Sequence, residues 1–154
     1  VLPVVGADTK FQPVFVDDVA AAVVVALDDI TARGVYELGG PDVASFRELM
    51  QTMLRVVHRN RIIANIPFFM ARAMAAGFGV VKALSLGLFT PPLTTDQVRN
   101  LAVDNVVADG ARGFADLGLS PRSMVSVLPD YLWRFRPSGQ YAEIKNSAKN
   151  LKQR

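Results

Sequence analysis

Residues 11–20, FQPVFVDDVA, constrain the fold more than any other part of the chain. Their β-branched and aromatic residues predict a strand, and Asp17 and Asp18, followed by an Ala- and Val-rich run, predict that a helix starts there. Residues 35–38 predict a second strand. The Gly-Gly-Pro sequence at residues 39–41 predicts a turn that ends it. The order strand, helix, strand, glycine-rich turn, helix is typical of the late part of a nucleotide-binding α/β fold.

Other segments carry the local signals of strands and helices. Ser45 followed by Glu48 has the spacing of a capping box at a helix start. Gly118 predicts the stop of a short helix over residues 109–117. In the helix expected after Asp18, one apolar face should hold Ala20, Val23, Val24 and Leu27. We expect strands over residues 1–5, 11–16, 35–38 and 62–66, and helices over 17–27, 45–57, 68–86, from Thr94 or Thr95 past Val103, and from Ser120 to Phe135.

The net charge of +3 belongs to the end of the chain. Four of the 17 basic and one of the 14 acidic residues lie from Gly139 onward, so residues 1–138 carry 13 of each. We therefore expect two parts: a body over residues 1–138 and a basic tail over 139–154 that is extended or ordered by a partner. A neutral body argues against a nucleic-acid partner, which requires basic residues gathered on one face.

The residue types that carry most catalytic chemistry are sparse. The chain has no cysteine, and its single histidine, His58, has no second ligand at metal-binding spacing. Asp17 and Asp18 are adjacent, so on a helix they point about 100° apart and cannot act on one atom. A capping role at the helix start explains them better. Tyr141 and Lys145 have a catalytic spacing but lie in the polar tail. With no glycine-rich phosphate turn either, the sequence predicts no catalytic, cofactor-binding or metal-binding residue here.

Residues 62–89 form the most apolar stretch, with only Arg72 and Lys82 charged, and four arginines occur just before it. The uncharged runs are shorter than the ~20 residues that span a bilayer. The stretch therefore predicts a helix lying at a membrane surface or against a partner protein, although packing inside this domain stays open. The residues expected to face a membrane or partner are Phe68, Phe69, Arg72, Phe78, Lys82, Lys145 and Lys149.

A series of motifs resembles one protein family. Residues 11–20 and 35–41 resemble the segments that follow the cofactor half in extended and atypical short-chain dehydrogenase/reductases. The later motifs narrow this to the NAD(P)H-binding accessory subunit of respiratory complex I; they are PPLTTDQV at 91–98, DNVV at 104–107, LGL at 117–119 and YLWRFRP at 131–137.

The resemblance implies the carboxy-terminal part of a Rossmann-like fold, with a smaller helical region, over residues 1–138. It implies a non-catalytic accessory subunit of complex I at the membrane-proximal peripheral arm, on the matrix side of the mitochondrial inner membrane or the cytoplasmic face of a bacterial one. Its partners would be other complex I subunits and an amino-terminal half of the same fold. This chain alone would bind no cofactor, and any NADP(H) would bind through that half.

Two other interpretations remain open from the residues. The chain could be the substrate-binding half of an NAD(P)-dependent sugar-nucleotide epimerase or reductase, or, more weakly, a membrane-surface module. The membrane-surface module makes no use of the expected strands. In the other interpretations, the strands expected at residues 1–5, 11–16 and 35–38 would have open edges unless further strands flanked them. We therefore expect that the chain is not a self-sufficient domain.

Overall fold

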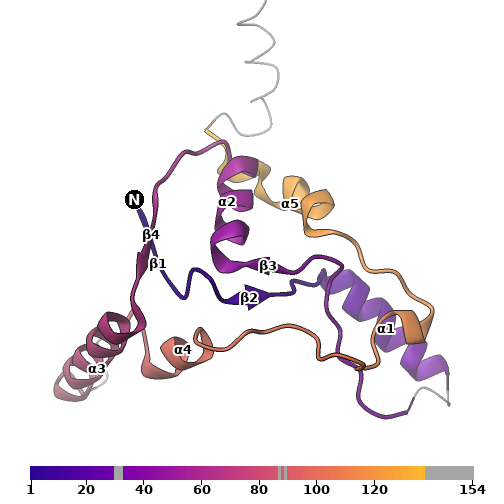
Figure 1. Ribbon diagram of the computed structural model, residues 1–154, viewed down its shortest axis with the longest axis horizontal. Helices are drawn as coiled ribbons and strands as arrows, with labels where there is room; N and C mark the ends of the chain where they lie inside the picture. Colours follow the sequence, from indigo (N-terminus) through magenta and orange to yellow (C-terminus); the bar gives the residue numbers. More distant parts are fainter. Residues whose placement is uncertain (30–32, 87, 89, 138–154) are drawn as a thin grey trace, which may run out of the picture.

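The computed structural model describes residues 1–29, 33–86, 88 and 90–137. Its elements form an open arrangement in which α3 and α1 lie at opposite ends, while α2 and α5 pack side by side between them (Figure 1). The elements are β1 Leu2–Val5, β2 Lys10–Phe11, α1 Val16–Asp28, β3 Ala44–Ser45, α2 Phe46–Val56, β4 Ile63–Ile66, α3 Phe68–Leu84, α4 Thr95–Asn100, the 3-10 turn η1 Ala115–Leu117, α5 Met124–Leu132 and the 3-10 turn η2 Trp133–Phe135.

Strands β1 and β4 form a two-stranded parallel sheet. Leu2 is opposite Ile63 and Val5 is opposite Ile66. The strands expected over residues 1–5 and 62–66 are therefore confirmed, and so is the helix that follows β4. Parallel strands need a long crossover connection, and here it contains α1 and α2. The result is a mixed α/β architecture with a parallel strand pair.

The main core lies where this sheet meets α3 and α4. Val5 and Val98 pack with Ala71 and Ala75, which are buried on the inner side of α3. The small alanine side chains allow α3 to approach its neighbours closely. Ile66, Phe68, Leu93 and Leu101 pack against the cluster from its edges.

A turn over residues 6–9 joins the sheet to two helices. Gly6 has φ +67°, and a Cβ there would lie 2.6 Å from the Leu101 carbonyl oxygen, so a side chain cannot be accommodated. The carbonyls of Ala7 and Thr9 accept hydrogen bonds from the first backbone N–H groups of α2. The Thr9 hydroxyl donates to the Leu101 carbonyl at 2.5 Å. One turn therefore fixes the start of α2 and the end of α4.

The capping box predicted at the start of α2 is confirmed. The Glu48 N–H donates to the Ser45 hydroxyl at 3.3 Å, and the Ser45 N–H donates to the Glu48 carboxylate at 2.7 Å. This second bond is the main reason that the pKa of Glu48 lies below its usual value. Helix α2 ends one residue earlier than expected, at Val56.

The strand predicted over residues 11–16 is wrong except at its first residue, because β2 covers only Lys10–Phe11. Beyond it, Pro13 has no N–H to donate. The Gln12 side chain takes the place of a neighbouring strand: its amide donates to the Gly40 carbonyl at 2.8 Å and its oxygen accepts from the Val107 N–H at 2.9 Å. One isolated parallel bridge between Phe11 and Asn105 also holds the start of the segment, but no continuous ladder follows it.

The strand predicted over residues 35–38 is also wrong, since no ladder forms there among the described residues. The Glu37 N–H donates to the Arg112 carbonyl at 2.8 Å, and the Glu37 carboxylate accepts from the Ala108 N–H. These two bonds connect the segment to a loop, not to a strand. A strand requires a neighbour along its length, and the described chain provides none here.

Helix α1 forms as expected, but two details differ. Its N-cap is Phe15, and no side chain caps it, so Asp17 and Asp18 lie in the first turn without the predicted capping role. The face expected to be buried is exposed, with Val24 56% and Leu27 80% accessible to solvent. The side chain that α1 buries is Ala22. Its apolar face has no partner among the described residues.

The two later helices are shorter than predicted. Thr94 caps α4, which ends at Asn100, so Leu101 is its C-cap and Val103 lies outside it. Ser123, not Ser120, caps α5. Of the short helix expected over residues 109–117, only the 3-10 turn η1 forms, and its stop at Gly118 is confirmed by φ +67°. The predicted tail, residues 139–154, lies outside the described residues.

Replacing Gly40 should destabilise the protein. A Cβ at this position would lie 1.9 Å from the Pro13 carbonyl oxygen, so Gly40→Ala must displace backbone and should lower the free energy of unfolding by roughly 1–3 kcal/mol. Gly79→Ala is the control, because nothing lies within 4 Å of its Cβ and alanine should add roughly 0.5–1 kcal/mol of helix stability. Chemical denaturation of the native protein measures both, and equal effects would contradict the close approach.

Candidate functional site: an apolar pocket and two exposed apolar helix faces

Asp18 and Arg122 join the start of α1 to the loop before α5. The Arg122 backbone N–H donates to one Asp18 oxygen at 2.7 Å, and its Nε donates to the other at 2.9 Å. Asp17 is a weaker partner, 3.8 Å from the Arg122 Nη2. The bond from the backbone N–H, followed by the bond and charge of the guanidinium, holds the pKa of Asp18 below its usual value. Asp18 therefore positions a segment 104 residues away.

Aromatic contacts complete this junction. The Arg122 guanidinium lies 4.2 Å from the centre of the Phe15 ring, a distance at which the cation attracts the ring face. The Phe15 ring meets the Tyr131 ring edge-on, with centroids 6.0 Å apart. Nearby, the Ser123 hydroxyl that caps α5 donates to the Asp42 carboxylate at 2.6 Å. These contacts hold α5 against the segment that leads into α1.

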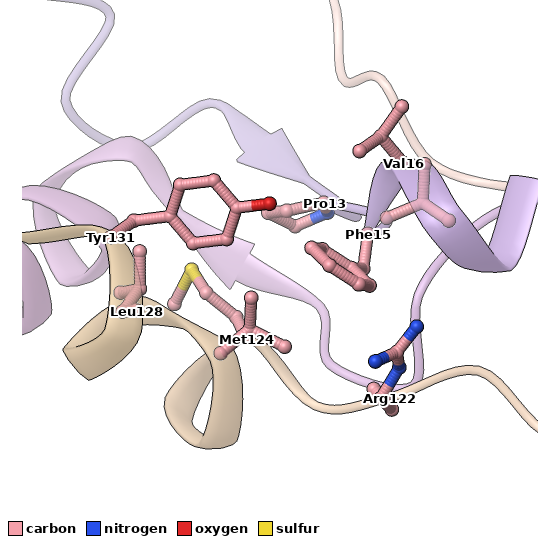
Figure 2. A pocket seen from close by; sticks show the side chains of 9 residues that line it. Pro13, Phe15, Val16, Arg122, Met124, Leu128 and Tyr131 are labelled. Carbon is pink, nitrogen blue, oxygen red and sulfur yellow. The ribbon is translucent and has the colours of Figure 1, made fainter.

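An apolar pocket of about 320 Å³ lies between these two elements. Figure 2 shows Tyr131 and Leu128 on the α5 side, with Phe15 and Val16 at the start of α1. The lining residues are Pro13, Val14, Phe15, Val16, Arg122, Met124, Val127, Leu128 and Tyr131.

The pocket has the chemistry of a recess for an apolar group. Its one charged lining residue, Arg122, is already paired with Asp18 and lies near Asp17, so its charge is largely satisfied by these two carboxylates. Its lining contains no histidine, cysteine or lysine that could act as a base or nucleophile. Within the described ranges, no group of three or more His, Cys, Asp or Glu residues could hold a metal ion.

Helix α3 presents a second feature, which we call the α3 face. At about 100° per residue, its exposed apolar residues fall within an arc of about 140° that contains no charge. Phe69 is 72% exposed and Leu84 is 80% exposed. The helix projects from the end of β4, away from α2 and α5 (Figure 1). The α3 face consists of Phe69, Met70, Met74, Val80, Val81 and Leu84.

The predicted partner-facing residues divide between the two sides of α3. Phe69 lies in the α3 face. Phe68 and Phe78 are half-buried, and Phe68 packs against the core cluster. Arg72 and Lys82 are exposed but lie outside the apolar arc. Lys145 and Lys149 lie outside the described residues.

Sequence reasoning missed most of the α3 face. The signal was present in the small residues Ala71 and Ala75, whose spacing of four marks the side that packs closely. The prediction placed Phe68, Phe69 and Phe78 together on the partner-facing side, although Phe68 and Phe78 are half-buried. Within the described ranges, no helix has the length and hydropathy that crossing a bilayer requires.

The second exposed apolar surface, the α1 face, lies at the other end of the molecule (Figure 1). It consists of Val16, Val23, Val24 and Leu27, all more than half exposed. Single exposed apolar residues are ordinary, but contiguous apolar faces mark contact surfaces.

The fold resembles that of a solved structure. The crystal structure of gox2253 matches with a TM-score of 0.55 and 20% sequence identity, covering 87% of this chain and 39% of that one. At this identity the likeness concerns the fold alone. No protein-family profile matches the chain.

Two curated proteins show the relationship by sequence. NADH dehydrogenase (ubiquinone) 1 alpha subcomplex subunit 9, mitochondrial, of Arabidopsis thaliana is 40% identical over 143 residues, which is 90% of this chain and 36% of that protein. NADH-ubiquinone oxidoreductase 40 kDa subunit, mitochondrial, of Neurospora crassa is 28% identical over 137 residues, 88% of this chain and 35% of that protein.

The chain belongs to the family that these subunits represent, which confirms the resemblance seen in its motifs. It spans about a third of the length of these relatives.

The Asp18–Arg122 contact should make the junction sensitive to acid. Folding lowers the pKa of Asp18, so the ionised carboxylate stabilises the folded state. This stabilisation is complete above the pKa of the unfolded group, about pH 4, and is lost as the pH falls through the lower pKa of the folded group. NMR titration of the Asp18 carboxyl should therefore give a pKa below 3.8.

Arg122→Gln should raise the pKa of Asp18 only part of the way toward 3.8, because the backbone N–H of residue 122 still donates. Arg99→Gln removes an exposed cation elsewhere and should leave this pKa unchanged. A pKa of Asp18 unaffected by Arg122→Gln would show that the side-chain pairing is not formed in solution.

Proposed function

We propose that the chain is part of a non-catalytic accessory subunit of respiratory complex I and supports its assembly and stability at the membrane-proximal peripheral arm. The α3 face is the observation that carries this proposal, because an uncharged apolar surface of this size requires a cover. The relatives are named as subunits of mitochondrial NADH dehydrogenase and NADH-ubiquinone oxidoreductase. Other subunits of that complex would therefore cover the α3 face. The location that follows is the matrix side of the mitochondrial inner membrane, or the corresponding face of a bacterial membrane.

We further propose that an amino-terminal half of a Rossmann-like dehydrogenase/reductase fold packs on the α1 face. Each strand of the β1–β4 pair has only one neighbour among the described residues, so the outer edges are available for further strands. Relatives about two and a half times as long could supply them. Any NADP(H) would bind in that half. The alternative of a sugar-nucleotide epimerase or reductase is not favoured by the relatives.

Polar substitutions in the α3 face should release the protein from its complex. Phe69→Gln combined with Met74→Gln and Leu84→Gln removes the apolar contact area, so we expect a several-fold loss of the subunit from the native complex. Native gel electrophoresis with mass spectrometry of the complex I band measures the loss. A wild-type chain that never co-migrates with complex I subunits would reject the proposed function.

The matched control is Val35→Gln with Val103→Gln and Val125→Gln, three exposed valines outside this face. It should leave co-migration unchanged, and an equal loss in both variants would point to misfolding. Flotation with vesicles that contain anionic phospholipid separates two covers for the α3 face. Flotation that the α3 variant abolishes indicates a bilayer surface, and absence of flotation indicates a protein neighbour.

The isolated chain should lack a cooperative thermal transition and gain one when the amino-terminal half of its own protein is supplied. The α1 face is then covered and the strand edges are paired, which supplies the missing buried apolar area. Calorimetry of the chain alone and after co-expression with that half tests this. A sharp transition of the chain alone would contradict the proposed division of the fold.

A further inference from the structure

A recess lined by arginines lies where α2 ends and the chain turns toward β4. Its volume is about 480 Å³. Arg55, Arg59 and Arg61 line it together with the amide side chains of Gln51 and Asn60. All five side chains belong to exposed residues, so the recess is open to a ligand. Leu54 and Ile62 complete the lining.

The backbone brings the three arginines together by reversing sharply after α2. His58 takes the left-handed conformation, with φ +55°, that glycine usually occupies after a helix. The Arg59 N–H donates to the Leu54 carbonyl at 2.9 Å, and the His58 N–H donates to the Arg55 carbonyl at 3.1 Å. These two bonds form a Schellman motif. They place Arg59 and Arg61 back beside the last turn of α2, which carries Arg55.

The positive charge of this recess is not neutralised within the described part of the chain. The ion pairs found there involve Arg122, and none involves Arg55, Arg59 or Arg61. The negative end of the α2 dipole amounts to only about half a charge. One of its carbonyls, that of Val56, already accepts from the Arg136 Nε at 2.9 Å. Three guanidinium groups therefore leave a local excess of positive charge.

This recess is distinct from the surfaces discussed above. It lies at the end of β4 opposite to α3, and none of its lining residues belongs to the α3 face, the α1 face or the apolar pocket (Figure 1). Residues 1–138 are neutral in total, so the clustering is local rather than a result of a basic composition. Three of the four arginines that precede the apolar stretch in sequence line this recess, where Ile62 is the stretch's only contribution to the lining.

We propose that the arginine recess binds a phosphate group carried by a ligand. A guanidinium presents a planar fork of N–H donors that matches two phosphate oxygens, and several forks on one recess suit a group with three or more oxygens. The amides of Gln51 and Asn60 add neutral donors at its wall. Two sources carry this chemistry: a soluble nucleotide or other phosphate ester, and the headgroup of an anionic phospholipid. The proposal does not depend on the proposed function.

The test uses the native protein, with inorganic pyrophosphate as the soluble probe and calorimetry as the measurement. Arg59→Gln combined with Arg61→Gln should weaken pyrophosphate binding by about tenfold or more, because charge-assisted bonds are lost. The matched control, Lys10→Gln with Arg99→Gln, changes the net charge equally at exposed positions outside the recess and should have little effect.

A second arm identifies the source of the phosphate. Flotation with phosphatidylcholine vesicles, with and without anionic phospholipid, is repeated for wild type and both variants. Anionic-vesicle binding that pyrophosphate displaces and the recess variant loses supports a lipid headgroup, whereas pyrophosphate binding without flotation supports a soluble ligand. Equal weakening in both variants overturns the proposal, since attraction would then be diffuse. Absence of pyrophosphate binding also overturns the proposal. This holds even if the recess variant loses binding to an acidic protein, because the ligand would then not be a phosphate group.

Discussion

The segment from Gly6 to Gln12 holds the described structure together. Its turn accepts the first N–H groups of α2 and donates through Thr9 to the end of α4. One residue further, the Lys10 N–H donates to the Asp104 carboxylate at 2.8 Å, and its carbonyl accepts from the Asn105 N–H. Helices, sheet and the long loop after α4 therefore depend on seven consecutive residues, whose polar groups are satisfied by segments distant in sequence.

The accuracy of sequence reasoning followed the range of the interactions concerned. The Ser45–Glu48 capping box and the Gly118 stop depend on neighbours within a few residues, and both were predicted correctly. The strands expected at residues 11–16 and 35–38 failed because a ladder depends on a neighbour elsewhere. Gln12 shows the difficulty most directly, since its side chain replaces a strand by bonds to residues 28 and 95 positions away.

The sequence predicted which residues belong to the apolar stretch around α3, but not which of them face outward. The sequence marked residues 62–89 as unusually apolar, but it could not tell which side of α3 is covered. Alanines, not phenylalanines, decide this, because Ala71 and Ala75 let the helix approach the core. The Asp18–Arg122 contact could not be predicted for a similar reason. An acidic residue in the first turn of a helix is expected to interact with that helix end, whereas the partner of Asp18 is 104 residues away.

The two apolar faces lie too far apart to share one small cover. The α1 and α3 faces occupy opposite ends of the molecule, with α2 and α5 between them (Figure 1). Each retains side chains that are more than half exposed, although burial of one such side chain contributes roughly 1.5–3 kcal/mol. The main core is made largely of alanine and valine, so the larger apolar residues remain for contacts outside it. We infer that this segment connects two neighbours, one that completes its fold through α1 and one that docks on α3.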